Sequence, residues 1–270
     1  MPYLFDHLDL VREVAELSPL GLAADLDGTI SEIAPSPDQA LVSPECRQHL
    51  AALTRSCEVV AVVSGRPARQ IAEMVGLGEL VYIGNHGLEW LKGEESSTWP
   101  GAKGHRARLA AARKELERLL RGGGVIFEDK GIGLALHYRV SPDPPSAREA
   151  ILAAVEKLSL RGEFSVGEGR MVVELRPPVE VSKGTALEAL VQRYGLKGAI
   201  YLGDDLTDVD AFATLHELQR ERVFRGLAVA VVSGEVAGKV VEEADVTLSG
   251  VGDVERFLRW LRQLFPGSAS

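Results

Sequence analysis

The stretch LAADLDGTI, residues 22 to 30, decides the fold. It is a short apolar run that ends in two carboxylates, Asp25 and Asp27, followed at once by Gly28. This pattern predicts a buried strand that leads into a tight turn. Because side chains alternate along a strand, we expect both carboxylates on the same side, where they repel each other unless a cation lies between them. On spacing alone, an acidic turn without a site is an equal alternative.

Length and charge narrow the class of protein. The 270 residues suffice for one large domain or two modest ones with a buried core. The formal net charge of -9 argues against a nucleic-acid or anionic membrane partner, because both require a basic surface. No apolar run approaches the ~20 residues of a membrane span, and the amphipathic N-terminal stretch does not resemble a signal peptide. We therefore expect a cytoplasmic protein and leave its oligomeric state open.

The two cysteines do not suggest a metal or disulfide site. Cys46 and Cys57 are the only cysteines of the chain, and they are not arranged in a CxxC spacing. A zinc site or a disulfide framework needs more cysteines or a closer spacing. We expect two free, buried thiols.

Strands and helices alternate at both ends of the chain. The expected strands lie at 22–25, 58–65, 80–90, 199–205, 225–232 and 244–250, and the expected helices lie at 3–17, 44–55, after Pro67, from 183, from 207 and at 254–265. Such alternation predicts a parallel sheet covered by helices on both faces. The fold class is therefore α/β with a Rossmann-like core.

The middle of the chain has a different pattern. A helix at 106–120 is followed by a β-hairpin at 125–140, and a second helix at 145–160 is followed by a hairpin at 163–177 with the turn GEGR at 167–170. Two helix–hairpin units predict a four-stranded antiparallel sheet with both helices on one face. We expect a core of residues 1–102 and 182–270, interrupted by an inserted α+β cap at 103–181.

Four motifs fall where predicted strands end or helices begin. They are DLDGT at 25–29, VSGR at 63–66, Lys183, and GDDLTD at 203–208. The carboxyl ends of parallel strands meet at one edge of a sheet, so these motifs are expected close together. Each is weak alone, since acidic residues at a helix start are also typical of capping. Together and in this order they resemble the haloacid dehalogenase-like (HAD) phosphohydrolases.

The resemblance implies phosphoryl transfer through a covalent intermediate. Asp25 is expected to attack a phosphate monoester and become an aspartyl-phosphate, and Asp27 is expected to act as general acid and then as general base. It also implies Mg²⁺, held by Asp25, the backbone carbonyl of Asp27, and Asp204.

Further residues are expected around the phosphate and the metal. The resemblance implies phosphate binding by Ser64, Gly65 and Lys183. It places Asp205 and Asp208 beside the metal ligands. Asp208 has a second interpretation, as the cap of the helix that follows Thr207.

Longer motifs resemble the trehalose-6-phosphate phosphatases in particular. They are DLDGTISEI at 25–33, YIGNHGLE at 82–89, EDKGIGLALHYR at 128–139, VVELRP at 172–177, and SKGTAL at 182–187 followed by GDDLTD. The resemblance implies hydrolysis of trehalose 6-phosphate to trehalose and phosphate, the last step of trehalose biosynthesis. The residues that it implies for substrate binding are Asn85 and His86 in the core, and Glu128, Lys130, Arg139 and Glu174 in the cap. Without the resemblance, charged residues on a cap strand are typical of its solvated side.

Other functions remain open at this point. Another HAD sugar-phosphate phosphatase, acting on sucrose phosphate or a mannosyl-phosphoglycerate, would share the motifs, as would a phosphomutase. A non-catalytic module in which Asp25 is only phosphorylated is a different kind of alternative. Asp27 argues against it, because such a module has no use for a general acid beside the phosphorylated residue.

Overall fold

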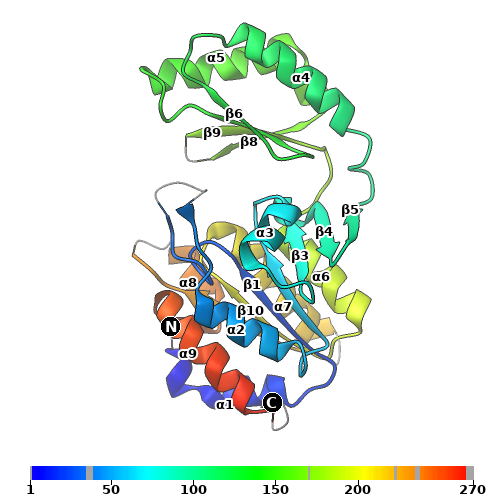
Figure 1. The fold of residues 1–270 in the computed structure, drawn as a ribbon, viewed down its shortest axis with the longest axis vertical. Coiled ribbons are helices and arrows are strands. Elements are labelled where there is room, and N and C mark those ends of the chain that lie inside the picture. Colours follow the sequence, from blue (N-terminus) through cyan, green and yellow to red (C-terminus); the bar gives the residue numbers. More distant parts are fainter. Residues whose placement is uncertain (1, 35–38, 170, 222–223, 235–237, 266–270) are drawn as a thin grey trace. The chain divides into compact units, whose positions relative to one another are not determined.

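The chain folds into two compact units. The computed structural model (Figure 1) describes residues 2–34, 39–169, 171–221, 224–234 and 238–265. One unit consists of Met1–Ser97 and Val181–Ser270, and the other of Thr98–Glu180. Among the described residues we find no helix with the length and apolar character that a membrane crossing requires.

The first unit is built on an eight-stranded sheet in the order β12-β11-β10-β1-β2-β3-β4-β5, counted over the described residues. Its strands are β1 (Leu20–Asp25), β2 (Val59–Val63), β3 (Val81–Gly84), β4 (Glu89–Lys92), β5 (Glu95–Thr98), β10 (Gly198–Gly203), β11 (Arg225–Val231) and β12 (Val246–Leu248). Neighbours from β12 to β3 pair in parallel, and β4 pairs antiparallel with β3. Because β1 lies between β10 and β2, the carboxyl ends of these three strands meet at one edge.

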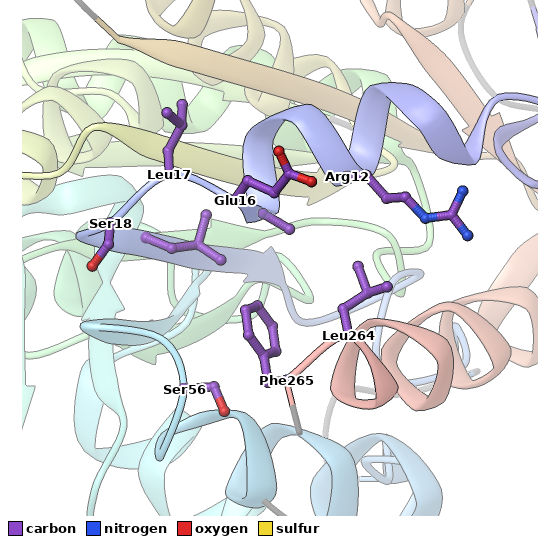
Figure 2. Close-up of a pocket in the computed structure, with 9 residues that line it drawn as sticks. Arg12, Glu16, Leu17, Ser18, Ser56, Leu264 and Phe265 are labelled. Carbon is purple, nitrogen blue, oxygen red and sulfur yellow. The ribbon is translucent and has the colours of Figure 1, made fainter. Parts of the chain in front are cut away.

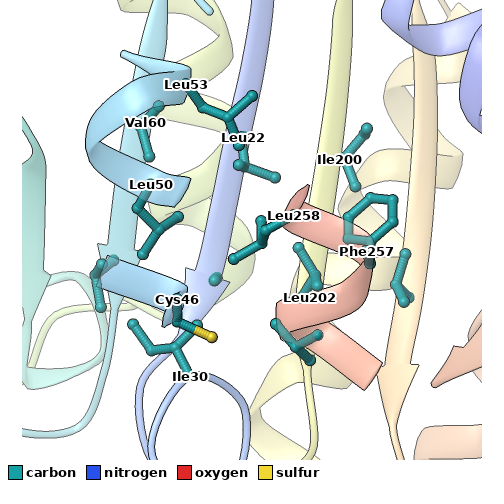
Figure 3. Close-up of a cluster of buried hydrophobic side chains, with 14 of the residues drawn as sticks. Leu22, Ile30, Cys46, Leu50, Leu53, Val60, Ile200, Leu202, Phe257 and Leu258 are labelled. Carbon is teal, nitrogen blue, oxygen red and sulfur yellow. The ribbon is translucent and has the colours of Figure 1, made fainter. Parts of the chain in front are cut away.

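Helices cover both faces of this sheet. One face is covered by α1 (Leu8–Ala15), α2 (Pro44–Leu53), α3 (Ala68–Val75) and α9 (Gly250–Gln263), and the other by α6 (Lys183–Tyr194), α7 (Val209–Glu221) and α8 (Gly238–Glu243). Successive side chains of a strand point to opposite faces of the sheet, so Leu22 packs against the first group of helices and Ala23 against the second. Figure 3 shows α2 and α9 packing their leucines and Phe257 against the sheet. The predicted α/β core is confirmed.

The second unit has its own four-stranded sheet in the order β6-β7-β9-β8. Its elements are α4 (Arg106–Leu119), β6 (Ile126–Asp129), β7 (Leu134–His137), α5 (Pro144–Lys157), β8 (Ser165–Gly169) and β9 (Val172–Arg176). All three strand pairs are antiparallel. Leu109 of α4 and Ile151 of α5 pack with Leu134 and Val173 of the sheet. The predicted antiparallel sheet with both helices on one face is therefore confirmed.

The single strand expected at 80–90 was wrong. The structure has β3, a 3₁₀ turn at Asn85–Gly87, and the antiparallel strand β4. Asn85 and His86 adopt left-handed backbone angles, with φ of 50° and 57°, and Gly87 follows with φ of 115°. Asparagine and glycine adopt such angles more readily than most residues. Buried apolar residues on both sides of this turn conceal it in the sequence.

Several other boundaries differ from the expected ones, and two elements, β5 and α8, were not expected. The helix expected at 3–17 is interrupted at His7, so that a 3₁₀ turn (Leu4–Asp6) precedes α1. The turn expected at 167–170 begins later, because β8 continues to Gly169, and Arg170 lies outside the described residues. The expected helices and strands are present, and the chain reversals between them were less well placed.

The packing of α2 on the sheet gives a direct test of stability. Leu50 is fully buried in this core, whereas Leu41 is 80% exposed. We expect Leu50→Ala to lower the free energy of unfolding by about 2–5 kcal/mol because it leaves a cavity. The matched change Leu41→Ala should stay within roughly 0.5 kcal/mol. Urea unfolding followed by tryptophan fluorescence measures both, and equal losses would contradict this assignment of the core.

Candidate active site

The exits of β1 and β10 approach each other very closely. Asp25 is the last residue of β1, and Gly28 follows with φ of 85°. A Cβ atom on Gly28 would lie 2.0 Å from a carboxylate oxygen of Asp204, just beyond β10. Glycine is therefore required here both for its backbone angle and for the space that it leaves. This contact brings the acids of two separate motifs to one place.

Three of the predicted acids form one cluster. Carboxylate oxygens of Asp25, Asp204 and Asp208 all lie within 4.8 Å of one another, and among the described residues this is the group of acids that could hold a metal ion. Asp25 and Asp208 are buried. Like charges so close together in a buried place need a positive partner.

Lys183 supplies one positive charge to this cluster. Its Nζ atom donates to Oδ1 of Asp25 at 2.6 Å and to Oδ1 of Asp208 at 2.7 Å, and its side chain is 2% exposed. Lys183 begins α6, whose N-cap Ser182 forms a capping box with Thr185. The cap fixes where the helix begins, and this places the lysine at the sheet edge.

Asp208 serves as the anchor of the cluster. Its Oδ1 atom accepts from Lys183 and, at 2.7 Å, from the hydroxyl of Tyr201. Its Oδ2 atom accepts from the backbone N–H groups of Asp204 at 3.2 Å and Asp205 at 3.0 Å. Asp205 and Asp208 together form a capping box over Leu206–Asp208. Asp208 therefore fixes the turn that carries Asp204 from the third position of that turn, whose N-cap is Asp205.

Burial changes the proton affinity of these groups. Burial, with the nearby charges of Asp208 and Asp204, raises the pKa of Asp25 well above its usual range despite Lys183. Burial and the charge of Asp208 raise the pKa of Asp204 to about 7. Burial disfavours the lysine ammonium, but Asp208 and Asp25 outweigh it and raise the pKa of Lys183.

The cluster fits a divalent cation. Three carboxylates and one ammonium leave a net charge of two negative units when all are ionised. Carboxylate oxygens are ligands that hard cations prefer. Because Asp208 already accepts four hydrogen bonds, Asp25 and Asp204 are the members best suited to bind an ion.

Asp27 has a different environment from Asp25. The strand β1 ends at Asp25, so Asp27 lies in the turn that follows it. The alternation of side chains along a strand therefore does not apply to Asp27, and the argument that placed both carboxylates on one side does not hold. The Asp27 carboxylate instead pairs with Arg66, whose Nε atom lies 2.7 Å from Oδ2 and whose Nη2 atom lies 2.7 Å from Oδ1. Arg66 belongs to the VSGR motif, but no role was expected for it from the sequence.

The structure brings the predicted Ser64, Gly65, Asn85 and His86 together. The Arg66 N–H donates to Oγ of Ser64 at 3.2 Å, and the His86 N–H donates to the Ser64 carbonyl at 3.0 Å. A Cβ atom on Gly65 would lie 2.6 Å from Nε2 of His86, so the imidazole ring covers this glycine. The turns that follow β2 and β3 are thus interlocked.

Three of the four predicted cap residues share one sheet face. The register pairs Glu128 with Ala135 and Ala135 with Glu174, so these residues form a row on the face opposite the helices. Lys130 follows β6 and donates to Oε1 of Glu174 at 2.7 Å, while His137 contacts Glu128 at 2.8 Å.

Arg139 is exposed in the turn that follows β7. Like Lys130, it lies outside the strands of this sheet. A guanidinium on a turn has more freedom to move than one on a strand.

A separate hollow lies at the opposite end of β1. It has a volume of about 440 Å³ and is lined by the ends of α1 and α9 together with Leu20, the first residue of β1 (Figure 2). It contains none of the predicted site residues. This hollow is therefore separate from the acidic cluster.

The raised pKa of Asp204 predicts how pH affects stability without metal. An unfolded aspartate has a pKa of about 3.9, whereas the folded value is about 7. The stability contributed by protonated Asp204 is full below the unfolded pKa and is lost as pH rises through the folded pKa. In EDTA, Asp204→Asn should therefore be more stable than the parent protein at pH 8, and the difference should vanish toward pH 4.

Urea midpoints across this pH range test the expectation, with the exposed Asp9→Asn as the matched control. Stabilities of the Asp204→Asn variant and the parent that run parallel from pH 4 to pH 8 would contradict it.

The family model and the curated relatives that match this chain point to the same family. A family model described as trehalose-phosphatase matches residues 23–250. The trehalose-phosphate phosphatase of Mycobacterium tuberculosis (strain H37Rv) is 36% identical over 205 residues, which cover 70% of this chain and 49% of that protein. The chain spans about half the length of the curated relatives that it matches.

Solved structures agree on the fold. The C-terminal domain of the trehalose-6-phosphate phosphatase of C. albicans superposes with a TM-score of 0.75 at 22% identity, covering 98% of this chain and 99% of that one. The Aspergillus fumigatus enzyme, in crystal form 3, gives a TM-score of 0.68 at 25% identity, covering 98% and 100%. The predicted resemblance is confirmed: this chain belongs to the trehalose-phosphatase family.

Proposed function

We propose that this chain is a Mg²⁺-dependent phosphatase that hydrolyses trehalose 6-phosphate through an aspartyl-phosphate on Asp25. The observation that carries the proposal is the buried Asp25–Lys183 pair beside Asp204 at the edge of a parallel sheet. Family membership and the names of the relatives support the substrate. Residues 1–102 and 182–270 form the proposed catalytic core, and residues 103–181 the proposed substrate-recognition cap.

The nucleophile is oriented by Lys183. Because the ammonium holds Oδ1 of Asp25, attack on phosphorus falls to Oδ2. The ester P–O bond breaks as the Asp25–phosphorus bond forms, and the leaving oxygen takes a proton from Asp27. Lys183 stays charged throughout because the neighbouring carboxylates raise its pKa.

The phosphate and the metal have separate binding groups. Ser64, Gly65 and Lys183 donate to the phosphate oxygens. Asp25, Asp204 and the backbone carbonyl of Asp27 hold the cation. When bound, Mg²⁺ offsets the negative charge of the phosphate and of the acids, so that the two anionic groups can approach.

The residues proposed for sugar recognition carry groups that suit hydroxyls. A disaccharide presents many hydroxyl groups, which carboxylates accept from and cations donate to. Glu128, Lys130, Glu174 and Arg139 supply such groups in the second unit, and Asn85 and His86 in the first. A cytoplasmic location stays a prediction from the sequence.

The nucleophile can be tested by one substitution. Asp25→Asn should lower phosphate release at least about 1,000-fold because amide oxygen forms no stable phosphoryl ester. The circular dichroism spectrum should be unchanged, and the exposed Asp9→Asn should keep full activity. Normal phosphate release from the Asp25→Asn variant would contradict the proposed mechanism.

Substrate identity is tested by a panel of sugar phosphates with and without Mg²⁺. Trehalose 6-phosphate should be preferred over sucrose phosphate and mannosyl-phosphoglycerate. Glu128→Gln should lower kcat/KM for trehalose 6-phosphate about 10- to 100-fold, since a hydrogen bond to a charged group contributes ~1.5–3 kcal/mol. The same variant should keep its kcat/KM for p-nitrophenyl phosphate, which has no sugar.

The exposed Glu149→Gln is the matched control for this experiment. A preference for either other sugar phosphate would favour the alternative sugar-phosphate phosphatases. An absence of activity on every substrate would favour a non-catalytic module.

A further inference from the structure

Asp27 is held by a fork of two hydrogen bonds. Arg66 donates from Nε to one oxygen of the Asp27 carboxylate and from Nη2 to the other, both at 2.7 Å. The Arg66 side chain is 13% exposed and that of Asp27 is 35% exposed. A bidentate pair fixes the plane and the direction of a carboxylate, which a single contact does not do.

The backbone that carries Arg66 is itself held in place. Its N–H donates to Oγ of Ser64, and its carbonyl accepts from the N–H of Asn85 at 2.8 Å. A Cβ atom on Gly84 would lie 2.7 Å from this carbonyl, so β3 packs directly against the turn. Glu89 of β4 accepts from the N–H of Ala68, which fixes the start of α3 just beyond Arg66.

Asp27 lies on a less regular segment than Asp25. It follows the end of β1, in a turn closed by the hydrogen bond from the Gly28 N–H to the Ser31 carbonyl at 2.7 Å. Arg66 is 39 residues away in the sequence and reaches it from the exit of β2. The Arg66 guanidinium therefore links the Asp27 side chain, which lies in a turn, to the well-fixed backbone that follows β2.

We infer that Arg66 is a positioning residue for Asp27 in the hydrolysis of the aspartyl-phosphate. This inference rests on the proposed function. In that step the oxygen of a water molecule bonds to phosphorus, the bond between phosphorus and Asp25 breaks, and its electron pair returns to the Asp25 carboxylate. One proton of the water passes to the Asp27 carboxylate, which Arg66 holds in the direction of the water.

The two half-reactions depend on Asp27 to different degrees. With p-nitrophenyl phosphate the leaving nitrophenolate is stable without a proton, so the first half-reaction does not need Asp27 as an acid. The second half-reaction still needs it as a base. A loss of positioning therefore slows only the second half-reaction with this substrate.

The experiment is rapid-quench kinetics with p-nitrophenyl phosphate and Mg²⁺ on the full chain. Arg66→Met should lower kcat about 10²- to 10⁴-fold, the usual range of general-base catalysis. KM should fall in parallel, so that kcat/KM stays within about threefold, because kcat/KM reports only the steps up to phosphoenzyme formation. A burst close to one nitrophenolate per active site should precede the slow phase.

Three further variants make the result decisive. Arg66→Lys should show the same burst, because one ammonium cannot hold both oxygens, and it covers the case in which Arg66→Met does not fold. Asp27→Asn should also give the burst, and the double variant with Arg66→Met should be no slower than Asp27→Asn alone. The exposed Arg69→Met is the matched control and should behave as the parent protein.

The outcomes separate this inference from the function on which it rests. A raised KM with no burst in both Arg66 variants would make Arg66 a substrate contact and overturn the inference. Parent-like kinetics in both Arg66 variants would overturn it as well. A parent protein without phosphatase activity would show that the proposed function itself had failed, and the inference with it.

Discussion

The first unit depends on one buried ammonium between two carboxylates. Lys183 lies between Asp25 and Asp208 with almost no solvent contact. Each of these charges would be very costly to bury alone, and only their mutual contact and hydrogen bonds make the arrangement stable. Because Asp204 adds a further acid, the group keeps an excess of negative charge. The acids that stabilise the buried charge of Lys183 thus also leave the excess negative charge that favours a bound cation.

Close backbone approaches make this group possible. A Cβ atom on Gly203 would lie 2.3 Å from the carboxyl carbon of Asp208, and one on Gly28 would meet Asp204. Both glycines lie at or just after the carboxyl ends of strands, and the parallel pairing of β1 and β10 brings these two ends together. The acids are therefore concentrated by the topology of the sheet, and the glycines determine how closely they pack.

The sequence predicted the elements better than the contacts between side chains. Apolar runs predicted most of the strands, and the helical pattern from residue 183 predicted the start of α6. The contact between Tyr201 and Asp208 was not predicted, because Tyr201 looks like one more apolar residue of a buried strand. The Arg66–Asp27 pair was missed for another reason: an arginine beside glycine in a turn gives no sign of which distant acid it meets.

The two acids of the DLDGT motif differ because their cations differ. Lysine carries a compact charge that can contact one oxygen of Asp25 and one of Asp208, which leaves the second oxygen of Asp25 to chemistry. Arginine has a planar fork that engages both oxygens of Asp27 and so controls its direction. The division of labour between two identical side chains, only two residues apart, therefore follows from the shapes of the cations that hold them.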